Sequence, residues 1–241
     1  MKKLSLFATM AFCAFSVWSQ NGIPMLGETA PSFTAETTNG KINFPEDFGS
    51  SWKMLFSHPK DFTPVCTSEI LGLAKMQDEF DDLGVKIVII SIDELATHHQ
   101  WKQYMEDLLL QSEGDTVKIH FPFISDNNAK VSNLYGMIHA WENETRDVRG
   151  VFIINPENKI QSISFYPNYI GRNLEEIKRV VLALQTSEKD QVSTPANWNY
   201  GDDVLLQYLP FSESDYSENQ DLQDQYYKVG VNMWYKRVST F

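Results

Sequence analysis

The sequence predicts an α/β fold in which helices cover a mixed β-sheet. Runs of β-branched and other apolar residues alternate along the chain with segments whose apolar residues recur at helical spacing. Two later runs, at residues 151–154 and 160–165, flank residues 155–158 (Asn-Pro-Glu-Asn), which are a strong turn signal. A tight hairpin is antiparallel, whereas parallel strands are joined by longer crossovers that usually contain a helix, so the sheet is expected to be mixed.

Each element of the first half is expected for a local reason. Asn-Gly predicts a hairpin turn, apolar side chains three or four residues apart predict a helix, and a glycine after them predicts its end, here at Gly84. A run that is β-branched and apolar almost throughout is typical of a buried central strand. In chain order we expect an extended lead-in (20–38), a hairpin turn (Asn39-Gly40), a strand (52–57), a helix (68–80) and a central strand (85–92).

The second half continues the alternation and then changes composition. In chain order we expect a helix (97–110), a strand (121–124), a helix (129–135), the two hairpin strands, and a helix (173–184) with one apolar face. After residue 185 the chain becomes polar, with Pro195, Pro210 and an acidic stretch. We therefore divide the chain into a first domain at 20–185 and a small C-terminal domain at 186–241, with strands at 204–208 and 231–238.

Composition limits the classes of partner. Hydrophobic residues make up 42% and aromatic residues 13% of the 241 residues, which is enough for a packed core. The formal net charge is -12 and there is no Lys/Arg cluster. This balance argues against nucleic acid and anionic membrane surfaces as partners.

Residues 1–19 have the three parts of a secretory signal peptide. Lys2 and Lys3 are followed by an apolar run, and Val17 and Ser19 are small enough for a cleavage site before Gln20. The alternative, a membrane anchor, needs about 20 apolar residues, and this run is shorter. Lipidation at Cys13 is not expected, because the bulky Phe12 precedes it and apolar residues follow. We expect an exported protein, periplasmic or secreted.

Cleavage there would leave Cys66 as the one cysteine of the chain, unable to form an internal disulfide. Thr63 suits a helix N-cap and Pro64 the first helical position, so Cys66 is expected in the first helical turn. The free N–H groups and the dipole at that end favour an anion, here a nucleophilic thiolate. The alternative is a buried, inert cysteine.

A thiolate that attacks an O–O bond needs hydrogen-bond donors for the oxygens on which charge develops. The hydroxyl of Thr63 lies at the same helix start. Arg149, just before a predicted strand, reaches the site if that strand is the neighbour of residues 52–57. The alternative is a solvated arginine at the end of a strand.

The residues around Cys66 resemble a known family. Pro59, Thr63 and Cys66 match Pro-x-x-x-Thr-x-x-Cys, the active-site pattern of peroxiredoxins. The run His-Pro-Lys-Asp-Phe-Thr-Pro-Val-Cys-Thr-Ser-Glu is similar to the one-cysteine class, typified by mammalian peroxiredoxin-six. Three further blocks continue the resemblance, at residues 149–156, 166–173 and 194–198, so that it covers nearly all of residues 23–241.

The resemblance implies a thioredoxin-like fold whose C-terminal domain helps to form a homodimer. It implies an antioxidant enzyme that reduces hydrogen peroxide and organic hydroperoxides through a sulfenic acid on Cys66, with an external thiol as reductant and no metal or organic cofactor. Thr63 and Arg149 would activate the peroxide, and Pro59 would shape the pocket and shield the sulfur. Three residues match supporting positions but also suit ordinary loop or helix charges: His58, Glu69 and Arg172.

Other functions fit the residues less well. A disulfide reductase needs Cys-x-x-Cys, and the chain has Cys66-Thr-Ser-Glu69. A non-catalytic or chaperone-like module on the same fold stays an alternative. Some relatives have a phospholipase serine, but here residues 49–53 are Gly-Ser-Ser-Trp-Lys, with Pro45 and Glu157 at the partner positions. That activity is not expected. No metal-ligand spacing is found, and His98-His99 is expected on a helix surface.

Overall fold

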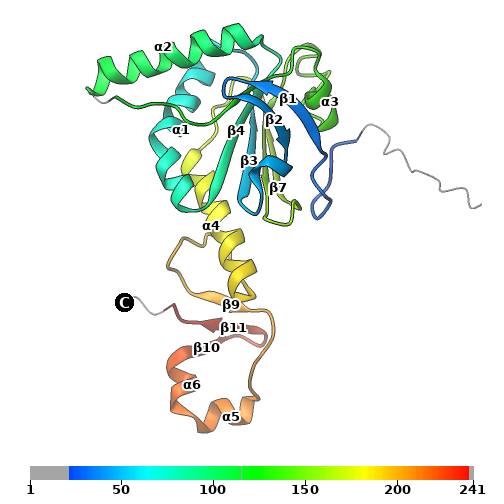
Figure 1. The fold of residues 1–241 in the computed structure, drawn as a ribbon. Helices are drawn as coiled ribbons and strands as arrows, with labels where there is room; N and C mark the ends of the chain where they lie inside the picture. The colour runs from blue at the N-terminus through cyan, green and yellow to red at the C-terminus, as the bar shows by residue number, and fades with distance from the viewer. Residues whose placement is uncertain (1–21, 115, 239–241) are drawn as a thin grey trace, which may run out of the picture.

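The computed structural model describes residues 22–114 and 116–238, and its first part is one seven-stranded sheet with helices on both faces (Figure 1). The strand order is β2-β1-β5-β4-β3-β6-β7. The strands are β1 (Phe33–Thr37), β2 (Gly40–Phe44), β3 (Trp52–Ser57), β4 (Val85–Ser91), β5 (Phe123–Ser125), β6 (Arg149–Ile154) and β7 (Ile160–Tyr166). The helices are η1 (Glu46–Phe48, a 3-10 turn), α1 (Pro64–Asp82), α2 (Leu95–Glu113), α3 (Lys130–Leu134) and α4 (Leu174–Asp190).

The sheet is mixed, as predicted. β3 pairs with β4 in parallel, and β4 with β5, whereas β3–β6, β6–β7, β1–β2 and β1–β5 are antiparallel. Both predicted hairpins form, with Thr37 opposite Gly40 in the first and a turn after Ile154 in the second. The pairing of β3 with β6 places Val151 opposite Phe56, so the start of β6 lies beside the end of β3.

The core has two parts because successive strand residues point to opposite faces. On β3, Met54 and Phe56 belong to the cluster that also contains residues of α1, α2 and α4. Leu55, between them, belongs to the cluster on the other face, with Tyr135 beside α3 and Phe44 from β2. β3 is therefore buried on both faces, and its end is a rigid base for the loop that follows.

The C-terminal part is a second, four-stranded sheet of order β10-β11-β9-β8, and α4 leads to it (Figure 1). Its elements are β8 (Val192–Ser193), β9 (Val204–Leu206), α5 (Glu213–Glu218), α6 (Gln220–Gln225), β10 (Tyr226–Val229) and β11 (Met233–Lys236). Buried Val192, Trp198 and Val204 pack against Leu182 and Ala183 of α4. The helix predicted to end at residue 184 continues to Asp190, through the proposed domain boundary.

The expected signal peptide at residues 1–19 lies outside the described residues. Within the described ranges, no helix combines the length and the apolar character needed to cross a membrane.

Asp147 is fully buried before β6, and neither of its carboxylate oxygens has a hydrogen-bond partner among the residues that the structure describes. Burial, and after it the nearby acids Asp126 and Asp93, raise its pKa well above the usual value and outweigh the nearby hydroxyl of Ser132, which lowers it. The folded chain therefore keeps a proton that the unfolded chain releases above about pH 4, and stability falls as pH rises from there until the folded pKa is reached.

We expect Asp147→Asn to remove this pH-dependent loss of stability, because the asparagine side chain resembles the protonated acid in shape. Measured by urea unfolding between about pH 5 and about pH 8, the difference in unfolding free energy should grow in favour of the variant. Its slope should approach about 1.4 kcal/mol per pH unit while the folded protein keeps the proton. Parallel stability curves for the two proteins would contradict the expectation.

Candidate active site

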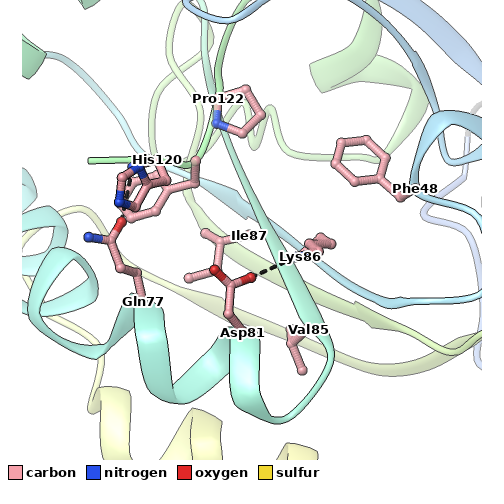
Figure 2. Close-up of a pocket in the computed structure, with 9 residues that line it drawn as sticks. Phe48, Gln77, Asp81, Val85, Lys86, Ile87, His120 and Pro122 are labelled. Atoms are coloured by element: carbon pink, nitrogen blue, oxygen red, sulfur yellow. Dashed lines mark hydrogen bonds and ion pairs between the residues drawn. The ribbon is translucent and has the colours of Figure 1, made fainter. Parts of the chain in front are cut away.

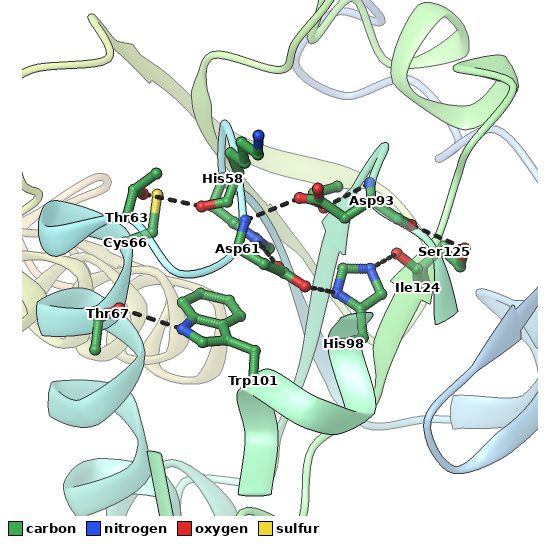
Figure 3. Close-up of polar contacts among 12 residues, drawn as sticks. His58, Asp61, Thr63, Cys66, Thr67, Asp93, His98, Trp101, Ile124 and Ser125 are labelled. Atoms are coloured by element: carbon green, nitrogen blue, oxygen red, sulfur yellow. Dashed lines mark hydrogen bonds and ion pairs between the residues drawn. The ribbon is translucent and has the colours of Figure 1, made fainter. Parts of the chain in front are cut away.

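The loop after β3 brings Cys66 into the first turn of α1, as predicted, and its side chain is fully buried (Figure 3). Thr63 occupies the N-cap position with an extended backbone, and Pro64 opens the helix. Thr63 is thus the N-cap residue, as predicted, although its side chain makes no capping hydrogen bond. Its hydroxyl donates instead to the carbonyl of Lys60 at 2.9 Å, so the oxygen keeps lone pairs that can accept a hydrogen bond.

Arg149, the first residue of β6, lies against the sulfur. Its Nη1 is 3.2 Å from Sγ of Cys66 and 2.7 Å from Oε2 of Glu69. Its Nε and Nη2 donate to the carbonyl of Asn168 at 3.1 and 2.6 Å. The side chain is 2% exposed, so the alternative of a solvated arginine is wrong. A guanidinium fixed along both edges directs one donor at the sulfur.

Glu69 joins two buried arginines one turn after Cys66. Its Oε1 accepts from the backbone N–H and Nε of Arg172, and its Oε2 from Nη2 of Arg172, each at 2.8 Å. Nη1 of Arg172 donates to Gly150, and the guanidinium lies 3.2 Å from the centre of the Phe56 ring. Burial opposes ionisation of Glu69, but Arg172 and then Arg149 outweigh it and hold its pKa below the usual value.

A buried set of charges is formed by four side chains, those of Cys66, Glu69, Arg149 and Arg172. Arg149 and Arg172 carry two positive charges and Glu69 one negative charge. The set sums to zero when Cys66 is a thiolate, and an uncompensated buried charge is costly. The arrangement therefore favours an anionic sulfur, in agreement with its place at a helix N-terminus.

A second buried group lies beside this set and includes His58, Asp61 and His98 (Figure 3). His58 Nε2 lies 2.7 Å from Oδ1 of Asp61, and His98 Nδ1 lies 2.8 Å from Oδ2. His98 Nε2 lies 3.0 Å from the carbonyl oxygen of Ile124 in β5. The prediction that His98 lies on the surface is wrong, because its side chain is fully buried on α2. The adjacent His99 is exposed.

The contact among these three side chains was also not predicted from the sequence. One ligand atom from each lies within 4.8 Å of the others, a donor set that zinc accepts. Zinc with ligands at about 2.0–2.1 Å separates tetrahedral neighbours by about 3.3 Å. The contacts of 2.7 and 2.8 Å are hydrogen-bond lengths, so the present arrangement is that of shared protons.

A signal for His98 was present in the sequence. His98, Trp101 and Met105 are three and seven residues apart, the spacing of one helix face, and all three are buried. The contact of Asp61 with His98, 37 residues later, needs the packing of α2 beside the loop and has no local signal. Pro59, between His58 and the rest of the loop, is buried, and its shielding role stays a prediction.

A surface cavity of about 230 Å³ lies elsewhere, where β4 begins (Figure 2). It is bordered by an ion pair of Lys86 with Asp81 at 2.7 Å and by a hydrogen bond from the backbone N–H of His120 to Oε1 of Gln77. None of the predicted site residues lines it. Cys66 follows the other end of the parallel pair β3–β4, so this cavity is separate from the candidate site.

Comparisons with known families match most of the chain. Residues 26–163 match the AhpC/TSA family, and residues 183–208 match the C-terminal domain of 1-Cys peroxiredoxin. A peroxiredoxin of Methanosarcina mazei is 45% identical over 184 residues, which are 76% of this chain and 84% of that protein. A 1-Cys peroxiredoxin of Dictyostelium discoideum is 37% identical over 208 residues, 84% of each chain.

Solved structures agree with the sequence matches. A mutant of peroxiredoxin 6 of Arenicola marina has a TM-score of 0.79 and 31% identity, covering 90% of this chain and all of that one. A yeast mitochondrial 1-Cys peroxiredoxin has a TM-score of 0.76 and 35% identity, covering 89% and 99%. The architecture predicted from the sequence, a thioredoxin-like fold with a mixed sheet, is thereby confirmed.

Proposed function

The chain belongs to the peroxiredoxin family, of the one-cysteine type, and is a thiol-dependent peroxidase; from this premise we propose that Cys66 reacts with the peroxide and that Thr63 and Arg149 activate it. One observation carries the assignment of the site: Nη1 of Arg149 lies 3.2 Å from Sγ of Cys66, inside a buried charge set that an anionic sulfur balances. His58, Glu69, Arg172 and Pro59 support this arrangement.

The first half-reaction balances with these groups alone. The Cys66 thiolate attacks one oxygen of the hydroperoxide, so that a sulfur–oxygen bond forms and the oxygen–oxygen bond breaks. The departing oxygen takes the proton of the attacked O–H group and leaves as water or alcohol. Arg149 donates to the oxygens while charge moves across them, and the lone pairs of Thr63 Oγ1 accept from the peroxide O–H. Sulfur is oxidised by two electrons and is left as the sulfenate, which takes a proton from solvent to become the sulfenic acid.

An external thiol completes the cycle. A first thiol condenses with the sulfenic acid, releasing water and forming a mixed disulfide, and a second thiol releases Cys66. Within the described residues Cys66 is the free cysteine, and it is buried. The start of α1 must therefore open for the reductant. In the yeast mitochondrial 1-Cys peroxiredoxin the thiol is resolved via glutathione/thioredoxin systems, and we propose a reductant of the same chemical kind here.

Export and dimer formation are further parts of the proposal. The signal-like residues 1–19 support export, and N-terminal sequencing of the protein isolated from its native cell would test it by finding Gln20 first. A C-terminal part similar to that of 1-Cys peroxiredoxins supports a homodimer. Light scattering in solution tests that assignment, and a monomer at micromolar concentration would contradict it.

The proposed role of Cys66 is tested by stoichiometry. One equivalent of hydrogen peroxide, added to reduced protein in the presence of a dimedone-type probe, should give one adduct, and mass spectrometry should place it on Cys66. The protein pretreated with a thiol-blocking reagent is the control and should give none. An unmodified Cys66 with peroxide left unconsumed would favour the alternative of a non-catalytic module.

A further inference from the structure

His98 faces a hydrogen-bond acceptor on each side of its ring. Nε2 lies 3.0 Å from the carbonyl oxygen of Ile124, which can only accept, so Nε2 carries a proton. Nδ1 lies 2.8 Å from a carboxylate oxygen of Asp61. An ionised carboxylate also only accepts, so Nδ1 carries a proton as well whenever Asp61 is ionised. With Asp61 ionised, this geometry makes His98 an imidazolium paired with Asp61, with both side chains almost completely buried.

The surroundings of Asp61 favour its ionised form. Burial opposes ionisation, but hydrogen bonds from His58 and His98 outweigh it and lower the pKa of Asp61. Burial lowers the pKa of His58 and outweighs the hydrogen bond and charge of Asp61, which raise it, and His98 adds to the lowering, so His58 is neutral near neutral pH. Its single proton lies on Nε2, which donates to Asp61 at 2.7 Å. Its Nδ1 then holds a buried lone pair with no hydrogen-bond partner among the described residues.

Asp61 also fixes the backbone of the loop between β3 and α1. Its N–H donates to Oδ2 of Asp93 at 2.9 Å. The next residue, Phe62, has a φ of 58°, a left-handed conformation that is strained for a residue with a side chain. A loop that contains such a residue keeps its shape only where other contacts hold it. The same loop presents Thr63 and leads directly to Cys66.

Helix α2 holds the start of α1 at a second point. Nε1 of Trp101, one turn after His98, donates to Oγ1 of Thr67 at 3.2 Å, and Thr67 follows Cys66 (Figure 3). The ring of Trp101 also lies 4.9 Å from that of His58. α2 therefore supports the loop before the cysteine through His98 and the helix after it through Trp101.

We propose that Asp61 and His98 are positioning residues of the peroxidase: an imidazolium–carboxylate pair that fixes the loop carrying Thr63 and keeps His58 in the tautomer with a proton-free Nδ1. The proposal rests on the assignment of Cys66 as the reacting residue. Among the described residues, the titratable groups beside His98 are Asp61 from the loop and His58 after β3, and β5 contributes a carbonyl; Asp93, after β4, accepts from the backbone of Asp61. Loss of the pair through substitution of His98 should therefore loosen the loop.

The test combines a measurement of protonation with a measurement of rate. In nitrogen-15 NMR of the reduced wild-type protein at neutral pH, one buried histidine should have both nitrogens protonated. A second should have a protonated Nε2 and a bare Nδ1. The first set of signals should be missing from His98→Gln and present in His99→Gln, the matched control on the exposed neighbour.

His98→Gln keeps a donor but loses the charge, so its single-turnover rate with hydrogen peroxide should fall by at least about tenfold, which corresponds to about 1.4 kcal/mol of activation free energy. His99→Gln should stay within about twofold of the wild type. A singly protonated His98 in the wild type would overturn the proposal even if the variant failed to fold. So would a folded His98→Gln that reacts at the wild-type rate. Failure of the dimedone test would instead remove the role of Cys66 and leave the protonation result standing.

Discussion

Cys66→Ser is expected to abolish peroxide reduction while the protein stays folded. A serine hydroxyl is far less ionised than a thiol near neutral pH and cannot replace the thiolate as nucleophile. The substitution exchanges one small buried side chain for another, and Oγ of serine can accept the hydrogen bond that Arg149 directs at the sulfur. The fold should therefore survive the change, and the loss of activity should be complete.

Peroxide consumption with excess thiol measures the activity, and circular dichroism with urea unfolding measures the fold. Ser68→Ala is a matched control in the same helical turn, because Ser68 is exposed and its hydroxyl donates to the backbone carbonyl of Val65. It should keep wild-type activity. A folded Cys66→Ser protein with activity near wild type would mean that the reaction does not pass through this sulfur.

Arg149→Ala should give the second largest effect, a loss of about 10²–10³ in the single-turnover rate with peroxide. The reason is that Arg149 stabilises the anionic sulfur and also donates to the oxygens. Its removal should lower the fraction of Cys66 present as thiolate at neutral pH as well as the rate. Glu69 keeps its bonds to Arg172 in the variant, so the rest of the site should stay in place.

Arg149→Lys should recover only part of this loss. An ammonium keeps the charge but cannot donate along two edges, as Arg149 does to Cys66 and Asn168. Stopped-flow kinetics gives the rate, and ultraviolet absorbance of the thiolate gives its fraction. Arg146→Ala, earlier in the same segment and outside the buried charge set, serves as the control. Rates for both Arg149 variants within a factor of about three of wild type, less than about 0.7 kcal/mol, would remove Arg149 from the site.

The parts of the molecule that local chemistry determines were predictable. The start of α1 follows from Pro64 at its first position, and the apolar runs gave β3 and the hairpin of β6 and β7 to within a few residues. The meeting of Arg149 and Cys66 needed one further assumption, that β6 pairs with β3, and the structure has this pairing. A short motif and one strand neighbour thus sufficed for the reacting pair.

Features that depend on packing were not predictable in the same way. Thr63 is at the predicted N-cap position, but its hydroxyl donates to a backbone carbonyl of its own loop in place of a capping hydrogen bond. α4 continues to Asp190 because the residues after the first core pack against the second sheet, which the polar composition conceals. The short helices α5 and α6 have no buried residues, so their sequences lack the apolar periodicity that predicts a helix.

The two buried arginines have a consequence for the catalytic cycle. Glu69 neutralises one of them, and the thiolate neutralises the other. Once the sulfenate on Cys66 has taken a proton, the neutral sulfenic acid, which is the form that a thiol attacks, no longer neutralises the second arginine. The oxidised protein then holds an unmatched positive charge in its interior. Oxidation should thus weaken the closed conformation at the moment when the reductant needs access to the sulfur. Amide hydrogen exchange at the start of α1 should accelerate on oxidation, and equal exchange in both states would refute the link. If exchange accelerates as expected, oxidation of Cys66 loosens the start of α1 in each turnover, and reduction restores the closed conformation.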